Sequence, residues 1–195
     1  MMSKIARRGP DASGQWADGS IGFGHQRLSI IDLSNYASQP MKDEVLDLAL
    51  VFNGTIYNYQ SLRQDLIKQG YTFFSHSDTE VIIKAYHFWG EDCVTHLDGM
   101  FAFCIWNQKT NQLFVARDRM GIKPLYFSLT DQAFSFASNT QALVSIGVDS
   151  SINSVALQQQ LSLHGVVPAP NTILNGVNKI KPATTLTIDT KGKVV

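Results

Sequence analysis

The sequence is short of cysteine and of net charge, and it contains no long hydrophobic run. Its two cysteines, Cys93 and Cys104, lack metal-ligand spacing, which favours free thiols in a reducing compartment. Because 16 basic residues balance 16 acidic residues, bulk electrostatics gives no reason to expect nucleic acid or a membrane as partner. No apolar stretch reaches the roughly 18 residues of a spanning helix, and no signal-peptide pattern is present. A cytoplasmic protein is expected.

The apolar content supports one folded domain of the α+β class. With 195 residues, 44% of them hydrophobic, the chain can bury roughly 70% of the surface its unfolded form would expose. Strands grouped apart from helices favour α+β over an alternating parallel fold. The expected strands are 19–31, 46–52, 100–106, 113–116, 124–127 and 133–137, with a terminal strand pair within 173–188, and the expected helices are 58–70, 78–90, 140–146 and 155–164.

The ends of the two longer helices carry recognisable signals. Asn58 can cap the first helix, and Gly70 can end it in a left-handed conformation. Ser77 or Asp78 begins the second helix, and Gly90 ends it. The apolar stripe of this second helix is expected to contain Val81, Ile82, Ala85, Phe88 and Trp89.

Asn53-Gly54 is the most informative dipeptide, because a side-chain amide beside a glycine N–H can form an oxyanion pocket. The expected strand 46–52 places the pair at a strand end, and a type I′ hairpin turn is the alternative. Arg27 upstream and Asp78 downstream could hold the two ends of an amino acid. Arg27 could instead be a structural partner of Asp32, and Asp78 could serve only as a helix cap.

Ordered blocks along most of the chain share the pattern of one enzyme family: Arg7-Arg8-Gly9-Pro10-Asp11, Gly24 to Ser34, Gln39-Pro40-Met41, Phe52-Asn53-Gly54, Ser77 to Val81, Gly99 to Phe103, Ala116 to Arg119 and Gly121 to Tyr126. Together they resemble the glutaminase domain of class II glutamine amidotransferases, which are N-terminal-nucleophile hydrolases. The resemblance is to the asparagine-synthetase-like branch. It implies a four-layer αββα sandwich.

The resemblance also implies roles for the candidate residues. Arg27 would grip the α-carboxylate of glutamine, and Asp78 would accept from its α-ammonium group. The Asn53 side chain and the Gly54 N–H would stabilise the tetrahedral oxyanion. Thr55 departs from the family, because asparagine synthetases generally carry Glu there, and that carboxylate helps to bind the ammonium group. Either glutamine therefore binds differently in this subgroup, or its affinity is lower.

The family's nucleophile is an N-terminal cysteine, and none precedes the Arg8-Gly9-Pro10-Asp11 block. Residues 1–195 are thus expected to be a glutaminase domain without its N-terminal nucleophile segment and without the C-terminal ATP-dependent synthetase domain. Such a chain should not hydrolyse glutamine. No cofactor or metal is expected in this domain, and ATP and Mg are expected in the synthetase domain. Glutamine and the synthetase domain are the expected partners, and a homodimer is a further option.

Several alternatives stay open. The segment 163–174 resembles the subgroup that amidates N-acetylglutaminylglutamine, and aspartate is otherwise the acceptor. The domain could also belong to a purine or glucosamine-forming amidotransferase, or be a non-catalytic docking or regulatory module.

Two further motifs suggest structural roles. Arg117-Asp118 is expected to be an ion pair beside a tight turn at Gly121. The run 145–151 resembles a pyrophosphate loop, but Ile146 stands where glycine is needed, so a helix end capped by Gly147 is favoured.

Overall fold

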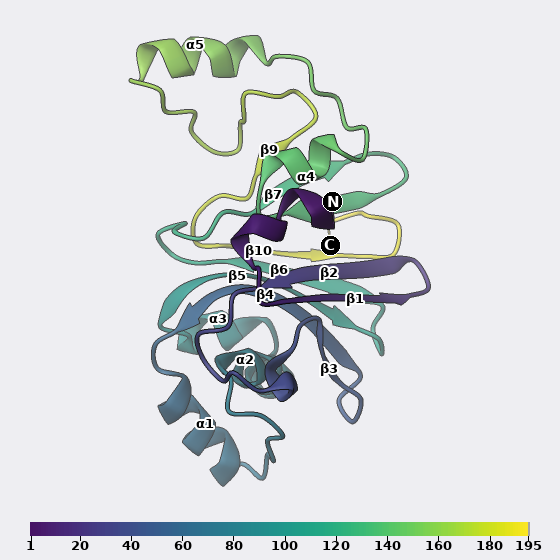
Figure 1. Ribbon diagram of the computed structural model, residues 1–195, viewed down its shortest axis with the longest axis vertical. Helices are drawn as coiled ribbons and strands as arrows, with labels where there is room; N and C mark the ends of the chain where they lie inside the picture. Colours follow the sequence, from purple (N-terminus) through teal and green to yellow (C-terminus); the bar gives the residue numbers. More distant parts are fainter. Residues whose placement is uncertain (195) are drawn as a thin grey trace.

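A five-stranded antiparallel sheet forms the centre of the molecule (Figure 1). The computed structural model describes residues 1–194. In spatial order, the strands are β10 (Thr184–Ile188), β6 (Gln112–Arg117), β5 (Gly99–Asn107), β4 (Leu48–Ile56) and β3 (Met41–Asp43). The two central strands are apolar on both faces: Leu48 to Phe52 and Phe101 to Trp106 are buried throughout. This matches a sheet that is covered on both sides.

One face of the central sheet packs on helices. Leu50 and Phe52 of β4 share a core cluster with Val81 and Ile82, which come from α2. As expected, Ser77 caps α2 and Gly90 ends it with φ of 61°. The helices of this layer are α1 (Tyr59–Lys68), α2 (Asp78–Trp89) and α3 (Cys93–His96), with the 3₁₀ turn η4 (Gly90–Asp92) between the last two.

Two expected details of the helical layer are wrong. Phe88 is 43% exposed, so it is not part of the buried stripe, and its ring packs edge-on against Tyr71. Asn58 occupies the first cap position of α1, but its side chain makes no capping bond. It instead donates to the His96 carbonyl and accepts from the Asp98 N–H. These bonds fix α1 to the end of α3.

The other face of the central sheet packs on a second β layer. Phe23 joins Val51 and Ala102 in the cluster between the two layers, and Phe134 and Phe136 pack against it. This layer consists of a hairpin, β1 (Ala12–Asp18) with β2 (Ile21–Arg27), and a separate sheet in the order β8 (Phe134–Ala137), β7 (Tyr126–Leu129), β9 (Asn178–Lys179).

The strands expected at 100–106, 113–116 and 133–137 match β5, β6 and β8 to within one residue at each end, whereas the other strand predictions differ from the structure. The expected strand 19–31 begins at Ile21 and ends at Arg27, and β1 and β3 were not expected. The strands within 173–188 are not a pair, because β9 pairs with β7 and β10 pairs with β6.

The outer layer on this side is α4 (Thr140–Val144), whose Ala142 and Leu143 pack on Ala137 of β8. The layers therefore run helix, sheet, sheet, helix, as the αββα expectation states. Short 3₁₀ turns η1 (Met2–Lys4), η2 (Ala6–Arg8) and η3 (Asn35–Ala37) complete the elements before α5.

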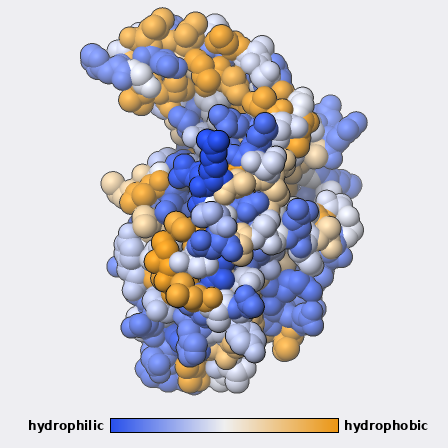
Figure 2. Space-filling view, in the orientation of Figure 1, coloured by the Kyte–Doolittle hydropathy of each residue, from blue (hydrophilic) through white to orange (hydrophobic). Residues whose placement is uncertain are grey.

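The helix α5 (Ser154–Ser162) lies apart from the layers, at the top of Figure 1. Only its Ala156 is buried, and Figure 2 shows hydrophobic residues gathered on this part of the surface. Among residues 1–194, no helix combines the length and the apolar character that crossing a bilayer requires.

Candidate functional site

All the predicted site residues line one cavity of about 760 Å³. Arg27 comes from the end of β2, and Asp78 comes from the first turn of α2. Asn53, Gly54 and Thr55 come from β4, which lies between those two elements. The fold therefore brings together groups that are up to 51 positions apart in sequence, from Arg27 to Asp78. Their roles in binding and catalysis stay predictions.

The edge of β4 that faces away from β5 is unpaired in part, and this determines which backbone N–H groups can face the cavity. The pairing of β3 with β4 ends at Met41 opposite Leu50, so later residues of β4 have no strand on that side. Side chains take over: the Phe52 N–H donates to Gln39 Oε1 at 2.6 Å, and the Ile56 N–H donates to Asp78 Oδ2 at 3.0 Å. Gly54 lies midway between these two residues. Since alternate residues of an antiparallel strand direct their amides to the same edge, the Gly54 N–H points there too.

Asn53-Gly54 is not a hairpin turn. The pair lies inside β4, opposite Ala102 and Phe101 of β5, and the strand continues to Ile56. The expected strand end at residue 52 is therefore wrong. A Cβ built on Gly54 would come within 2.2 Å of the Met100 carbonyl oxygen, so close contact between the two backbones requires glycine here.

The Asn53 side chain points into the space between the two β layers. Side chains alternate along a strand, and Val51, on the same face as Asn53, belongs to the cluster between the layers. Thr55 shares this face. An amide and a hydroxyl group are thus presented on the side of β4 where the cavity lies.

Arg27 is only 7% exposed, yet backbone carbonyls alone orient its guanidinium. One Nη donates to the Ser34 carbonyl at 3.0 Å, and the other donates to the Asp32 carbonyl. Arg27 is therefore a structural partner of Asp32, as the alternative states, but through the Asp32 backbone carbonyl and not its carboxylate. This contact leaves room for a ligand on the guanidinium. No carboxylate of residues 1–194 forms an ion pair with Arg27, and its guanidinium has N–H groups beyond those two. The guanidinium therefore keeps a positive charge that no carboxylate of the described residues neutralises, and this charge suits a carboxylate ligand.

Asp78 is the acidic counterpart, 4% exposed at the start of α2. Burial raises the pKa of its carboxyl group above the ordinary 3.8, although the Ile56 N–H acts in the opposite direction. Within the described residues, Asp78 forms no ion pair. A buried carboxylate without a cation is costly, and a bound ammonium group would relieve that cost.

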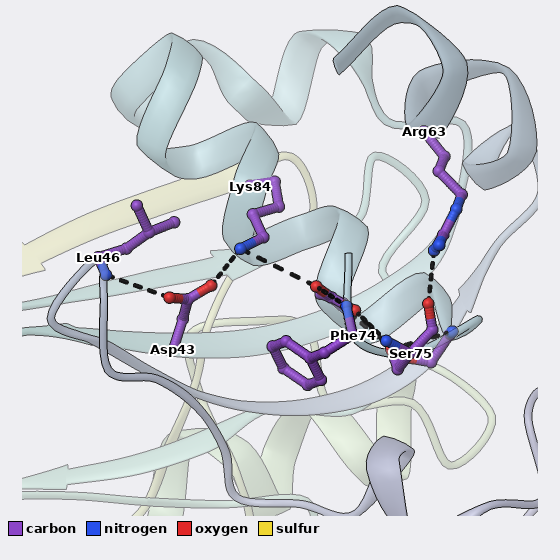
Figure 3. A network of polar contacts seen from close by, with 8 residues as sticks. Asp43, Leu46, Arg63, Phe74, Ser75 and Lys84 are labelled. Atoms are coloured by element: carbon purple, nitrogen blue, oxygen red, sulfur yellow. Dashed lines mark hydrogen bonds and ion pairs between the residues drawn. The ribbon is translucent and has the colours of Figure 1, made fainter. Parts of the chain in front are cut away.

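A buried polar network holds the segment that leads into Asp78 (Figure 3). Glu80 is fully buried, and its carboxylate accepts from the N–H of Phe74 at 3.0 Å and from the N–H and Oγ of Ser75 at 2.7 Å. Lys84 approaches Glu80 at 3.9 Å and pairs closely with Asp43. Sequence reasoning missed this network. The available signal was the Ser-x-x-Glu pattern of a capping box at 77–80.

His25 is a second group that the sequence did not single out. Its Nε2–H donates to the Phe52 carbonyl at 3.2 Å, one residue before Asn53. Burial lowers the pKa of its ring to about 4, with the positive charge of Arg27 acting in the same direction and the Phe52 carbonyl in the opposite one. Nδ1 is buried, and it has no hydrogen-bond partner among the described residues. His25 is therefore neutral near pH 7.

Arg117 and Asp118 are structural, as expected, but they do not pair with each other in the described chain. The Asp118 carboxylate accepts from the N–H groups of Phe101, Met120, Ile122 and Lys123, while Arg117 donates to the carbonyls of Gly121, Lys123 and Ile180. Both side chains thus fix the turn that follows β6. Because Phe101 lies opposite Gly54, Asp118 also supports the site.

The remaining candidates have structural roles, although Cys104 lies in the wall of the cavity. Gly147, with φ of 85°, donates to the Val144 carbonyl just after α4, so the run 145–151 is the expected helix end. Cys93 and Cys104 are free and buried, and burial raises the pKa of Cys93 to about 12 and that of Cys104 well above its usual range. Neither thiol is suited to act as a nucleophile.

A family model described as a glutamine amidotransferase domain matches residues 1–195. The chain belongs to this family. It is 42% identical over 194 residues to asparagine synthetase [glutamine-hydrolyzing] 1 of Bacillus subtilis, which covers 100% of this chain and 30% of that protein. A putative asparagine synthetase [glutamine-hydrolyzing] 2 of Methanocaldococcus jannaschii is 36% identical, over 97% of this chain and 40% of that one. The domain thus spans well under half of these relatives.

A solved structure confirms the fold. Glutamine phosphoribosylpyrophosphate amidotransferase from B. subtilis superposes with a TM-score of 0.63 at 24% identity, over 89% of this chain and 34% of that one. This likeness shows the αββα architecture and nothing finer.

Proposed function

We propose that this domain, in the full-length protein, hydrolyses glutamine to glutamate and ammonia for the ATP-dependent amidation of a carboxylate. The observation that supports it most is the shared cavity. A buried guanidinium, a buried carboxylate, a side-chain amide and the open-edge N–H of Gly54 all border it. These groups complement an amino acid whose side chain ends in an amide.

In this proposal each group binds a different part of glutamine. Arg27 binds the α-carboxylate, for which a planar guanidinium suits better than a lysine ammonium. Asp78 binds the α-ammonium group. The Asn53 amide and the Gly54 N–H stabilise the oxyanion, which is worth about 3 kcal/mol per donor in comparable hydrolases. Thr55 offers the ammonium group a neutral hydroxyl instead of a second charge.

The nucleophile in this proposal is a cysteine thiol whose own free α-amino group serves as base. Cys93 and Cys104 lie inside the chain and are buried, so they have neither the amine nor the access. The thiol would therefore come from a segment outside residues 1–195. Without that segment, we expect no hydrolysis of glutamine.

The remaining part of the full-length protein is proposed to consume the ammonia. ATP and Mg²⁺ are proposed to bind in that part, as the similarity to asparagine synthetases implies. The acceptor is aspartate or, as the likeness of segment 163–174 implies, an N-acetylated glutaminylglutamine. A homodimer belongs to the same proposal. So does a cytoplasmic location, because free thiols persist in a reducing compartment.

The exposed apolar residues of α5 form a surface on which another part of the same polypeptide is proposed to dock. Helix α5 buries only Ala156, and its Val155, Leu157 and Leu161 are exposed. The ATP-dependent part of the protein is the proposed occupant, because the chain spans only 30% of the B. subtilis synthetase. The exposed apolar residues in and around this helix are Ile152, Val155, Leu157, Leu161, Leu163 and Val166.

The test is an ammonia-release assay on the full-length protein with glutamine as substrate. We expect release by the wild type and a strongly raised KM in Arg27→Ala. A docking or regulatory module that only retains the fold would release no ammonia in either form. Release with an unchanged KM in Arg27→Ala would contradict the carboxylate-binding role.

A further inference from the structure

Asp32 forms a link between two segments that are far apart in the sequence. Its Oδ1 accepts from the Ser34 N–H at 2.9 Å, and its Oδ2 accepts from the His76 N–H at 2.7 Å. The first bond closes a local turn of the kind that aspartate commonly makes. The second bond crosses 44 positions of sequence and reaches the segment that leads into α2.

The main chain of the same turn orients Arg27. The guanidinium donates to the carbonyls of Asp32 and Ser34, so the turn closed by the Asp32 side chain is also the one that fixes the cation. His76 precedes Asp78 by two positions, next to the cap residue Ser77. One oxygen of Asp32 thus closes the turn that orients Arg27, and the other binds the segment that leads into Asp78.

We propose that Asp32 is a positioning residue that sets the spacing between Arg27 and Asp78. This inference rests on the proposed binding of glutamine between those two groups. The α-carboxylate and α-ammonium of an amino acid are attached to one carbon atom, so the two charged side chains must be held at a narrow distance from each other. A direct tie between their supporting segments provides that constraint without contact with the ligand.

The backbone and charge of Asp32 agree with this role. Its φ is +51°, a left-handed conformation that aspartate and asparagine tolerate better than most residues. Burial acts to raise the pKa of its carboxyl group, but the hydrogen bonds from Ser34 and His76 outweigh it and hold the pKa below the ordinary 3.8. The carboxylate is therefore the form that makes both bonds near pH 7.

The experiment compares Asp32→Asn with the wild type in the full-length protein. Asparagine tolerates the left-handed backbone but offers one acceptor oxygen in place of two, so one of the two bonds is lost. We expect KM for glutamine to rise on the order of tenfold, as for the loss of one charge-assisted hydrogen bond, while kcat changes by less than about twofold. Asp32→Gly, which keeps the positive φ and removes both bonds, should raise KM at least as much.

Asp47→Asn is the matched control. Asp47 also has a left-handed backbone, with φ of 57°, and its exposed carboxylate lies 3.5 Å from Lys109 in a turn that does not border the cavity. We expect its KM to equal that of the wild type. This control separates the loss of a carboxylate at a left-handed position from the loss of the link to His76.

The possible outcomes distinguish this inference from the proposed function. Ammonia release by the wild type with an unchanged KM in both Asp32 variants overturns the positioning role alone. A fall in kcat and melting temperature without a rise in KM also overturns it, because a purely structural role predicts that pattern. If Asp32→Asn does not fold, the KM of Asp32→Gly decides. No release by the wild type overturns the proposed function and this inference together.

Discussion

The carboxylate of Asp78 accepts a hydrogen bond of 3.0 Å from the backbone N–H of Ile56. This bond joins the start of α2 to the open edge of β4, two residues beyond Gly54. Oδ2 of Asp78 therefore accepts from an N–H group that no neighbouring strand pairs with, and Asp78 also borders the cavity. The anionic group and the proposed oxyanion donor are held at a fixed separation by a single interaction.

Glutamine binding should weaken on acidification. Burial raises the pKa of Asp78, so the carboxyl group takes up a proton at a higher pH than its ordinary 3.8 and loses the charge that holds an ammonium group. We expect KM of the full-length protein to rise over the range in which pH falls toward the raised pKa of Asp78. Asp78→Asn should have a high KM with little dependence on pH over this range. A KM profile of that variant that parallels the wild type would refute the role of Asp78.

Gly54→Ala should destabilise the domain. The new Cβ would meet the Met100 carbonyl oxygen at 2.2 Å and the Phe101 Cα at 2.8 Å, and neither backbone atom can move cheaply. Overpacking of this kind costs about 1–3 kcal/mol or more. Urea-dependent hydrogen exchange in β4 of the full-length protein measures the loss.

Gly22→Ala is the control for this change. Gly22 is also a strand glycine, and its Cβ would meet nothing within 4 Å. We expect a change within about 0.5 kcal/mol. Equal effects of the two substitutions would show that the contact between β4 and β5 is not the reason for glycine at position 54.

Stability should fall as pH drops from 6.5 toward 4 because of His25. In this interval the unfolded chain protonates the histidine, but the folded chain keeps it neutral, so acid favours unfolding. The full effect of that pKa difference is about 3 kcal/mol. His25→Gln, whose side-chain N–H can still reach the Phe52 carbonyl, should lose this part of the pH dependence. His164→Gln, a change at an exposed site, should keep it, and the same slope in both variants would contradict the account.

Glu80→Gln should loosen the segment before α2. Glu80 accepts from three donors of Phe74 and Ser75, and an amide presents only one acceptor oxygen to them. A loss of about 2 kcal/mol is expected, with faster hydrogen exchange at the start of α2. Glu44→Gln is the control, since its side chain is 83% exposed and its pairing with Lys42 contributes little. No difference between the two variants would refute the role of Glu80.

From the sequence, the candidate site residues could be selected, but the strands and loops that hold them could be predicted only in part. Arg27, Asn53, Gly54 and Asp78 stand in recognisable motifs, and the fold brings them to one cavity. Asn53-Gly54 was nevertheless expected at a strand end or turn, because local propensity favours a turn. Its real place depends on β3 stopping opposite Leu50, a tertiary feature that no local pattern reveals.

The sequence did not predict β1 or the hydrogen bonds of His25 and Asp32, and the reason is the same for all three. β1 is a mostly polar run with neither the helical nor the alternating pattern of apolar residues. Its pairing with β2 brings the ring centroids of Trp16 and Phe23 to 5.7 Å from each other. His25 reaches Phe52 and Asp32 reaches His76 over 27 and 44 positions of sequence. Periodicity reports which face of an element is buried, and it does not report which distant backbone group a polar side chain will meet.

The central claim is tested most directly by a crystal structure of the full-length protein with glutamine bound and the nucleophilic cysteine replaced by alanine. The account predicts the α-carboxylate on Arg27, the α-ammonium group on Asp78, and the side-chain carbonyl oxygen within hydrogen-bonding distance of the Asn53 amide and the Gly54 N–H. Glutamine bound in another place, or in this cavity with its two ends exchanged, would contradict it.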